Sequence, residues 1–406
     1  MIKRMNTKIF MNTLLANKYC TFVTDGTHDS PKPQSSGRYL ITSKHLGRYQ
    51  LDFQSANFIS EEDYLKIITR SSVEQWDILY SMIGTIGNIY IETNPAVEYA
   101  CKNMGIFKLG GDSKKAKWLY YYLQSPMAKA YIAGVARGTT QGYVPLGALR
   151  NLPIEVPSDD RRDKIVRILW NLDKKIRTNI AINEILEQQI EALLLAFLDN
   201  KDAIPVKLGD YLYIKGRIGW KGLKKSEYLS QSGYRIINGE TLTKSGIDWN
   251  KAGYISEERY VESPEIMLQV GDILLSKDGT IGKIGYVDSL ELPTSVASGI
   301  FVIRNNKPDI ISTTFIYYLL KSRFFESFIA ARTEGSVIPH LYQKDFMEFE
   351  FPLPSSDKMA EFEELTEPMF SQIVNNLNEN KKLAALRDGL LPKLMSGELD
   401  VSNLVL

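Results

Sequence analysis

Two short stretches of this sequence have the glycine spacing of a loop that could hold a phosphate. Gly84-Thr85-Ile86-Gly87 and Gly279-Thr280-Ile281-Gly282 each lie between apolar runs. A P-loop needs GxxxxGK followed by Ser or Thr, and a dinucleotide site needs GxGxxG opening a helix; neither pattern is present. Asp278-Gly279 between two apolar runs is typical of a hairpin turn. The sequence therefore favours a turn, and a phosphate- or nucleotide-binding enzyme using the GTIG loops stays as the alternative.

Other residue sets that would indicate covalent chemistry are incomplete. A DNA aminomethyltransferase needs Asn/Asp-Pro-Pro-aromatic, and Asn94-Pro95 is followed by Ala96. Glu379-Asn380-Lys381 has the ExK pattern of a nuclease, but it falls on a helical repeat. Metal-ligand spacing does not join the histidines and cysteines, which are His28, His45, His340, Cys20 and Cys101. We therefore predict no metal site and no catalysis by this chain alone.

Basic and aromatic residues alternate in one loop of the second half of the chain. IKGRIGWKGLKK, residues 214–225, offers Arg217, Trp220, Lys221 and Lys224 as candidate DNA-binding residues. Cations contact phosphates, and side chains on glycine-rich loops can reach base edges. The corresponding loop of the first half, TDGTHDSPKP at residues 24–33, is less basic and offers His28 and Lys32. The two loops are therefore expected to bind different targets.

A polar loop precedes each helical tail. RGTTQGYVP (137–145) matches RTEGSVIPH (332–340), and both contain an arginine and small hydroxyl residues. Arginine and hydroxyl groups bond guanine edges and phosphates. The further DNA-binding candidates are Arg137, Thr139, Thr140 and Gln141 in the first half and Arg332, Ser336 and His340 in the second.

These loops belong to a frame that occurs twice. FISEEDY (58–64) returns as YISEERY (254–260), and the GTIG stretch returns 195 residues later. WLYYYLQS (118–125) is answered by FIYYLLKS (315–322), a separation of 197. Separations that stay within two residues of one another indicate a tandem duplication, with repeats too long for a solenoid. The start of the second copy, VKLGDY (206–211), has no clear counterpart in the first.

Each copy ends in a helical pattern with a heptad seam. Its first-copy positions are Ile165, Leu169, Leu172, Ile176, Asn179, Asn183, Leu186, Ile190, Leu193 and Phe197. The second-copy positions are Phe362, Thr366, Met369, Ile373, Asn376, Asn380, Leu383, Arg387, Leu390 and Leu394. Seam asparagines set alignment and partner choice, so Asn179, Asn183, Asn376 and Asn380 predict that the helices pair. Antiparallel pairing would place the globular parts at opposite ends of a seam roughly 50 Å long.

The expected fold is α/β (α+β): two tandem domains, each followed by a long α-helix, with the helices paired as an antiparallel coiled coil. Short β-rich runs alternate with helical stretches such as residues 313–331. The expected boundaries are 1–157 for the first domain, 158–200 for the central helix, 201–354 for the second domain and 355–406 for the C-terminal helix. Pro368 is expected to start or kink the second helix. Thr366 and Arg387 are polar residues at seam positions and so interrupt the apolar heptad pattern of that helix.

The composition indicates a globular, cytoplasmic protein. The 406 residues suffice for two or three domains, and 44% hydrophobic and 24% charged residues are ordinary values. Two cysteines predict no disulfide framework, and neither a signal peptide nor a membrane span is expected. The net charge of +1 gives no global basic field, so basic loops must be judged where they cluster.

Several linked motifs resemble the DNA-specificity subunit of type I restriction-modification systems. They are GDILLSKDGTIGKIGYV (271–287), YISEERY (254–260), the polar loop before FPLPSSDK (351–358) and a helix ending LRDGLLPKLMSGEL (386–399). DGTHDSPK (25–32) is similar to one version of that family's target-recognition domain. The resemblance covers essentially the whole chain, in the order recognition domain, helix, recognition domain, helix.

The resemblance implies a non-catalytic subunit that reads a bipartite, asymmetric double-stranded DNA target, one half-site per recognition domain. The helix pair would set the gap and hold two methyltransferase subunits, which use S-adenosylmethionine to methylate adenine. Restriction subunits with motor and nuclease activity, and with ATP and Mg as their cofactors, would complete the assembly. This chain itself would hold no cofactor. A coiled-coil scaffold, which predicts no DNA preference, is a further alternative.

Overall fold

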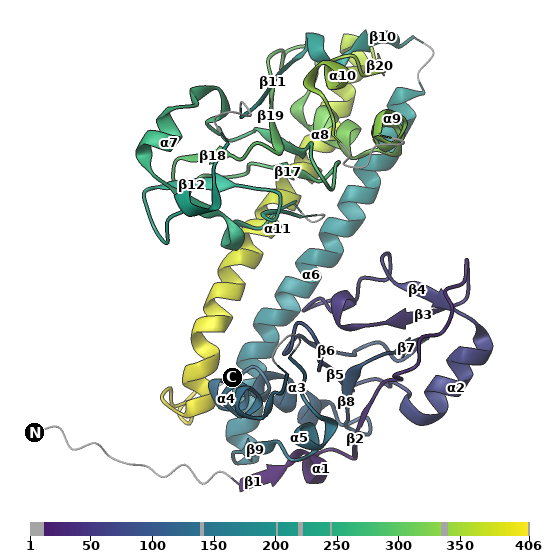
Figure 1. Ribbon diagram of the computed structural model, residues 1–406, viewed down its shortest axis with the longest axis vertical. Coiled ribbons are helices and arrows are strands. Elements are labelled where there is room, and N and C mark those ends of the chain that lie inside the picture. Colours follow the sequence, from purple (N-terminus) through teal and green to yellow (C-terminus); the bar gives the residue numbers. More distant parts are fainter. Residues whose placement is uncertain are drawn as a thin grey trace, which may run out of the picture. The chain divides into compact units, whose positions relative to one another are not determined.

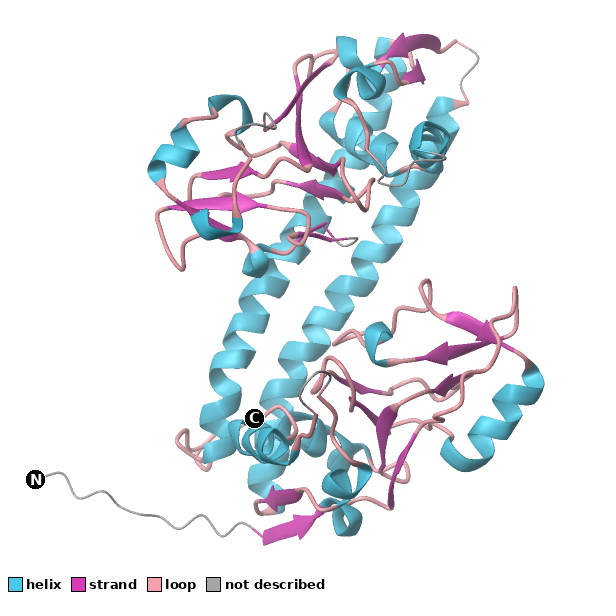
Figure 2. Cartoon of the chain, in the orientation of Figure 1, coloured by secondary structure: helices cyan, strands magenta, loops and turns pink. Residues whose placement is uncertain are grey.

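The chain divides into two compact units that each contain part of both long helices. The computed structural model describes residues 12–138, 142–199, 202–217, 222–243, 246–333 and 340–404. Unit 1 is Met1–Asn179 with Glu379–Leu406, and unit 2 is Ile180–Asn378. Both units mix helices with short strands (Figure 2). The compact units thus cut across the four predicted segments, because each core takes residues from both helices.

Unit 1 contains a four-stranded antiparallel sheet, a three-stranded sheet and a two-stranded sheet. Their strand orders are β2-β8-β5-β6, β4-β3-β7 and β1-β9. The strands are β1 (Asn12–Leu15), β2 (Phe22–Asp25), β3 (Arg38–Ile41), β4 (Asn57–Ile59), β5 (Ile78–Ser81), β6 (Ile89–Ile91), β7 (Tyr99–Cys101), β8 (Met104–Lys108) and β9 (Pro153–Val156). The helices are α1 (Ala16–Tyr19), η1 (Ser43–His45), α2 (Glu61–Ser71), α3 (Ser113–Tyr122), α4 (Pro126–Val135), α5 (Leu146–Arg150) and the first half of α6 (Asp159–Leu198). Figure 1 shows β2, β8 and β5 side by side.

Unit 2 repeats this topology strand for strand. Its sheets have the orders β11-β19-β16-β17, β15-β12-β18 and β10-β20, with an added β13-β14 hairpin. The strands are β10 (Ile204–Lys207), β11 (Leu212–Gly216), β12 (Tyr234–Ile237), β13 (Leu242–Thr243), β14 (Gly246–Ile247), β15 (Gly253–Ile255), β16 (Ile273–Ser276), β17 (Ile284–Tyr286), β18 (Thr294–Val296), β19 (Ile300–Asn305) and β20 (Glu350–Leu353). The helices are η2 (Leu208–Asp210), η4 (Lys225–Glu227), η5 (Trp249–Lys251), α7 (Glu257–Val261), η6 (Pro264–Ile266), α8 (Thr313–Lys321), α9 (Arg323–Thr333), α10 (Gln343–Met347) and part of α11 (Ser356–Ser396). The duplication and the α/β class are confirmed.

The structure supplies the counterpart of VKLGDY that the sequence did not reveal. β1 pairs antiparallel with β9, and β10 pairs antiparallel with β20. The Ala16 N–H donates to Leu152 O at 2.8 Å, and the Leu208 N–H donates to Phe349 O at the same distance. Residues 12–20 therefore occupy the place of residues 204–212, although the two stretches share few residue types.

Local sequence explains why the repeated motifs form the same elements. In FISEEDY and YISEERY, Ser60 and Ser256 are the N-caps of α2 and α7, and each hydroxyl accepts a backbone N–H three residues on. The glutamates in the first turn of each helix stabilise it, because their negative charges lie near the positive end of the helix dipole. The all-apolar α3 and α8 faces fill the two cores with aromatic residues such as Trp118 and Phe315.

The two long helices pair antiparallel within each unit, as predicted, and every predicted seam position is buried or half-buried. In unit 1, Asn179 Nδ2 donates to Asn380 Oδ1 at 2.9 Å, and Lys164 Nζ donates to Ser402 O at 2.9 Å. In unit 2, Asn376 Nδ2 donates to Asn183 Oδ1 at 2.7 Å, while the Phe197 and Phe362 ring centroids lie 5.4 Å apart. All four seam asparagines therefore meet across the seam, where each bond favours one register.

One seam departure, Arg387, is compensated by a buried acid. Its side chain is 2% exposed, and Nη1 lies 2.7 Å from Oδ1 of Asp173, which is fully buried. The Tyr49 and Tyr121 hydroxyls donate to the Asp173 carboxylate at 2.9 and 2.7 Å. A buried charge is tolerated when it is paired and hydrogen-bonded, and this cluster satisfies both conditions. It also ties the loop at Tyr49 and helix α3 to the helix pair in unit 1.

The expectation for Pro368 is wrong as regards a helix start. α11 begins at Ser356 and continues through Pro368 to Ser396. Proline removes one backbone donor and so weakens one turn. Apolar residues on both sides of the proline, among them Phe362, Phe370 and Ile373, are buried in the unit 2 core, and this packing holds the helix together.

The Asp173–Arg387 pair yields a stability prediction. Arg387→Ala should lower the free energy of unfolding by ~3–5 kcal/mol, because it leaves an uncompensated buried carboxylate. The Lys175–Glu379 pair of the same helices is about half exposed, so Lys175→Ala should have a much smaller effect, because water screens an exposed ion pair. Urea unfolding of both variants measures this, and equal effects would contradict the assignment.

A double variant separates buried charge from packing. The positions of unit 2 equivalent to Asp173 and Arg387, 197 residues apart in each case, hold buried Phe370 and Ile190. Asp173→Phe with Arg387→Ile should therefore be more stable than Arg387→Ala alone, because no charge is left buried. A double variant less stable than the single one would show that shape, and not charge, dominates this site.

Candidate nucleic-acid interface

In unit 1, the predicted binding loops leave the four-stranded sheet at one edge. Asp25 at the end of β2 pairs with Gly105, and Ser81 at the end of β5 pairs with Met104. The DGTHDSPK loop after β2 and the GTIG turn after β5 therefore start at the same level of the sheet. Unit 2 repeats the arrangement, because Gly216 ends β11 opposite Phe301 and Ser276 ends β16 opposite Ile300.

The GTIG turn of unit 1 is a β-hairpin turn whose amides are used internally. Gly84 and Gly87 have φ of 75° and 96°, which is the left-handed region that favours glycine. The Gly87 N–H donates to Ser81 O at 3.2 Å, and the Asn88 N–H donates to Ser81 Oγ at 3.0 Å. The Ser81 hydroxyl in turn donates to Thr85 O. Backbone donors that already have partners cannot cradle a phosphate, so this geometry disfavours the nucleotide-binding alternative.

The unit 2 turn has the same construction. Gly279 and Gly282 have φ of 66° and 89°. The Ser276 hydroxyl donates to Thr280 O at 2.7 Å and accepts the Lys283 N–H at 2.9 Å. Sequence reasoning missed these serines, although Ser81 and Ser276 recur at the same separation of 195 as the glycines.

The polar loop before α5 is attached to the GTIG turn of unit 1. Ile83 and Tyr143 form a backbone bridge, and the Val144 N–H donates to Met82 O at 2.9 Å. Arg137 and Tyr143 exchange backbone hydrogen bonds of 2.9 and 2.8 Å, which close the loop. The turn and the polar loop therefore form one continuous edge in which the Arg137 side chain is exposed.

The corresponding loop of unit 2 is attached in the same way, and this corrects the matching of the two loops. Asp278 and His340 form the equivalent bridge, and the Leu341 N–H donates to Lys277 O at 2.9 Å. His340 therefore corresponds to Tyr143, 197 residues earlier, and not to Pro145 as the aligned RGTTQGYVP and RTEGSVIPH imply. Arg332 likewise lies in the last turn of α9, whereas Arg137 follows α4. The separation between copies changes from 195 to 197 between the GTIG turn and this loop.

His28 and Lys32 lie where the first-half prediction places them, on the loop after β2. His28 Nε2 lies 2.9 Å from Asp25 Oδ2, and Nδ1 lies 2.9 Å from Asn103 Oδ1. Both ring nitrogens thus have hydrogen-bond partners within unit 1, while the His28 side chain is 63% exposed. Arg70 of α2 donates to Gly26 O at 2.8 Å and braces the start of the loop. Asn103 and Arg70 carried no signal in the sequence.

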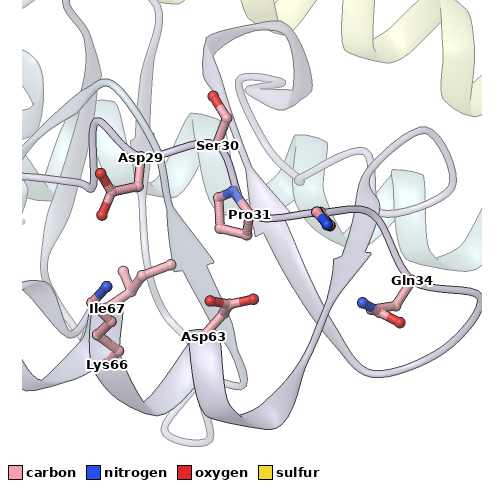
Figure 3. A pocket seen from close by; sticks show the side chains of 8 residues that line it. Asp29, Ser30, Pro31, Gln34, Asp63, Lys66 and Ile67 are labelled. Atoms are coloured by element: carbon pink, nitrogen blue, oxygen red, sulfur yellow. The ribbon is translucent and has the colours of Figure 1, made fainter.

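Lys32 lines a pocket between this loop and α2. Figure 3 shows the pocket between Asp29, Ser30 and Pro31 of the loop and Asp63 and Ile67 of the helix. Gln34 and Lys66 complete the lining. The pocket combines ammonium groups, which contact phosphates, with carboxylate and amide groups, which bond base edges.

The structure places Arg217 inside unit 2 rather than on the loop surface. The residue is 2% exposed, and Nε donates to Val296 O at 3.1 Å. Its Nη1 and Nη2 donate to the hydroxyls of Ser263 and Ser295 at 3.4 and 3.3 Å. Burial, together with the charge of Arg259, lowers the pKa of Arg217. Its guanidinium joins β18 to the segment before η6.

Three other second-half candidates lie at or near the surface of unit 2. Lys224 is exposed just before η4, and the Arg332 guanidinium lies 4.5 Å from the centroid of the Phe328 ring. His340 pairs through Nδ1 with the Asp278 carboxylate, which the sequence prediction did not include. Six candidates lie outside the described residues: Thr139, Thr140, Gln141, Trp220, Lys221 and Ser336.

Two further properties of the described residues concern metal binding and membrane insertion. In that part of the chain, no cluster of three or more His, Cys, Asp or Glu side chains could hold a metal ion. Among the described helices, none is both long and apolar enough to cross a membrane. Cys20 and Cys101 are buried free thiols.

The fold and its repeated loop edge define a protein of two tandem α/β modules joined by paired helices. A family model described as "Type I restriction modification DNA specificity domain" matches residues 33–188 and again 200–384. The chain belongs to this family.

Individual relatives match over most of their length. The Methanocaldococcus jannaschii type I restriction enzyme MjaIX specificity subunit is 25% identical over 386 residues, which cover 90% of this chain and 87% of the relative. The Haemophilus influenzae HindI specificity subunit is 21% identical and covers 81% of this chain and 88% of the relative. The crystal structure of a type I restriction-modification S subunit from M. genitalium has the same fold, with a TM-score of 0.54, 18% identity, and coverage of 96% of this chain and 97% of that one.

The GTIG geometry predicts a stability effect. Gly279→Ala should lower the free energy of unfolding by ~1–2 kcal/mol, because a side chain at φ 66° is strained although the added Cβ meets no atom within 4 Å. Gly233→Ala is the matched control, since Gly233 also has open space and no left-handed φ. It should change stability by less than about 0.5 kcal/mol. Equal losses in denaturant unfolding would contradict a left-handed turn at Gly279.

Proposed function

We propose that this chain is the DNA-recognising specificity subunit of a type I restriction-modification system. Each unit reads one half of a bipartite, asymmetric double-stranded DNA target through the edge formed by its GTIG turn and flanking loops. The subunit performs no chemistry itself and aims catalytic partners at the site. Membership of the specificity-domain family, matched twice along the chain, supports this assignment.

One structural observation carries the proposal. The backbone frame of the two edges is the same down to single bridges, while the side chains on it differ: Ile83 and Tyr143 in unit 1, Asp278 and His340 in unit 2. A catalytic or scaffold role would not explain why the two units keep the same backbone bridges while the side chains at those bridges differ. Two readers of different base sequences need this combination, because side chains at base edges set specificity and the frame sets their position.

The edge residues have distinct proposed roles. The exposed cations are Arg137 and Lys32 in unit 1 and Lys224 and Arg332 in unit 2. These four contact phosphates or guanine edges. Arg217 is left out of the contact set because its guanidinium is buried. Thr139, Thr140, Gln141, Trp220, Lys221 and Ser336 remain candidate contacts on the same loops.

The proposed partners are those of a complete type I system. Two methyltransferase subunits, with S-adenosylmethionine as their cofactor, dock on the paired helices and methylate adenine in each half-site. Restriction subunits with ATP and Mg join them, and the complex works in the cytoplasm. The antiparallel helix pair sets the gap between half-sites, and its seam asparagines hold the register on which that gap depends.

Adenine methylation mapped across a genome that expresses this chain with its methyltransferase tests the proposal. The expected result is one bipartite motif with two unlike half-sites and a gap of constant length. Arg137→Ala should relax or weaken the first half-site only, by about 1–3 kcal/mol if it reads a base. The control is Lys18→Ala, an exposed lysine of α1 that lies before β2 and thus at the opposite end of that strand. Methylation without a shared motif would refute the assignment.

A further inference from the structure

The bridge between the GTIG turn and the polar loop joins side chains of different chemistry in the two units. In unit 1 it joins Ile83 to Tyr143, and in unit 2 it joins Asp278 to His340. The adjoining hydrogen bonds, from the Val144 N–H to Met82 O and from the Leu341 N–H to Lys277 O, are both 2.9 Å long. Position and backbone are thus conserved between the units while an apolar pair is replaced by an acid–imidazole pair.

The unit 2 pair is held in place but not buried. His340 Nδ1 pairs with Asp278 Oδ1, and the two side chains are 35% and 43% exposed. The His340 ring packs edge-on against Tyr342 with centroids 4.5 Å apart. On the other side, Gly299 leaves room for the acid, because a Cβ there would come within 3.4 Å of Asp278 Oδ2. The carboxylate is therefore pre-organised, with part of its surface open.

An exposed carboxylate on a DNA-reading edge has few compatible partners. Phosphates repel it, so it cannot serve to position the backbone of the duplex. The major groove offers it two kinds of donor, the N4 amine of cytosine and the N6 amine of adenine. Guanine and thymine present acceptors at the corresponding places, N7 and O6 or O4, and a carboxylate disfavours both. The Ile83–Tyr143 pair of unit 1 has an apolar body instead, which suits the thymine methyl group.

We propose that the Asp278–His340 pair is a specificity-determining contact that selects an amine-bearing base, cytosine or adenine, at one position of the second half-site. Asp278 accepts the base amine, and His340 holds its carboxylate in place. The Ile83–Tyr143 pair takes a thymine methyl at the corresponding position of the first half-site. The inference rests on the proposed function, since it requires that these edges face DNA.

Selection of bound sites from a randomised DNA library, with the full chain in complex with its methyltransferase partner, tests the contact. Asp278→Ala should leave the first half-site and the gap unchanged and remove base preference at one position of the second. Discrimination at that position should fall roughly 5- to 150-fold. Asp210→Ala is the matched control: Asp210 is an exposed acid of η2, just before β11, and so lies at the opposite end of the sheet. Its motif should equal that of the wild type.

A second variant, which exchanges the pair instead of removing it, distinguishes a lost base contact from a misfolded loop. Asp278→Ile with His340→Tyr places the unit 1 pair on the unit 2 bridge and should move the preference at that position towards thymine. A motif unchanged in both variants overturns the inference and leaves the proposed function standing. Loss of the entire second half-site in both, with unchanged melting temperature, also overturns it, because the pair would then only hold the loop. A wild-type complex that selects no bipartite motif refutes the proposed function and this contact with it.

Discussion

The burial of both long helices in both cores is the constraint on which the rest of the structure depends. The unit 1 core includes Ile165 and Leu169 of α6 together with Leu391 and Leu394 of α11. The unit 2 core includes Ile190 and Leu194 of α6 together with Phe362 and Ile373 of α11. Neither core is complete without residues from the tail of the other copy, because apolar surface on α3 and α8 would otherwise meet water. The duplication of the domain and the pairing of its helices therefore depend on each other, because each core needs a helix from both copies.

The polar residues in the helix pair make this arrangement specific. The Asn179–Asn380 and Asn183–Asn376 bonds cross the seam between α6 and α11, and the buried Asp173 carboxylate pairs with Arg387. Apolar burial alone tolerates small shifts of one helix along the other, whereas a displaced polar group would lose its partner at a cost. The proposed reading of two half-sites at a set separation requires such a register.

The two units share their backbone elements and differ in the side chains on the loop edge. Strand order, the N-cap serines and the serine-stitched GTIG turns recur, because each satisfies backbone groups that any copy of the fold must satisfy. The side chains on the loop edge do not satisfy such backbone groups, so they can differ between the two units. This division explains why the glycine motif, which first suggests a phosphate site, instead marks where the proposed reading edge begins.

Much of this could be predicted from the sequence, and the failures have identifiable causes. The duplication, the mixed fold, the helix seam and the hairpin turns follow from local patterns, and the structure confirms them. The helix start at Pro368 was wrong because packing on both sides outweighs one missing hydrogen bond. The loop matching was wrong by two residues because loop residues repeat too loosely to reveal where the separation changes.

By itself, the sequence determined the period-7 helices, the copied strands and the turn glycines, since each depends on neighbours along the chain. Only the tertiary structure decided which polar side chains face inward. Arg217 and Lys224 look alike in a basic loop, yet one donates to Val296, Ser263 and Ser295 while the other is exposed. Arg387 looked like a flaw in the seam until Asp173, 214 residues away, met it. Asp278 and His340 became a pair through a bridge spanning 62 residues, a contact that no local pattern encodes.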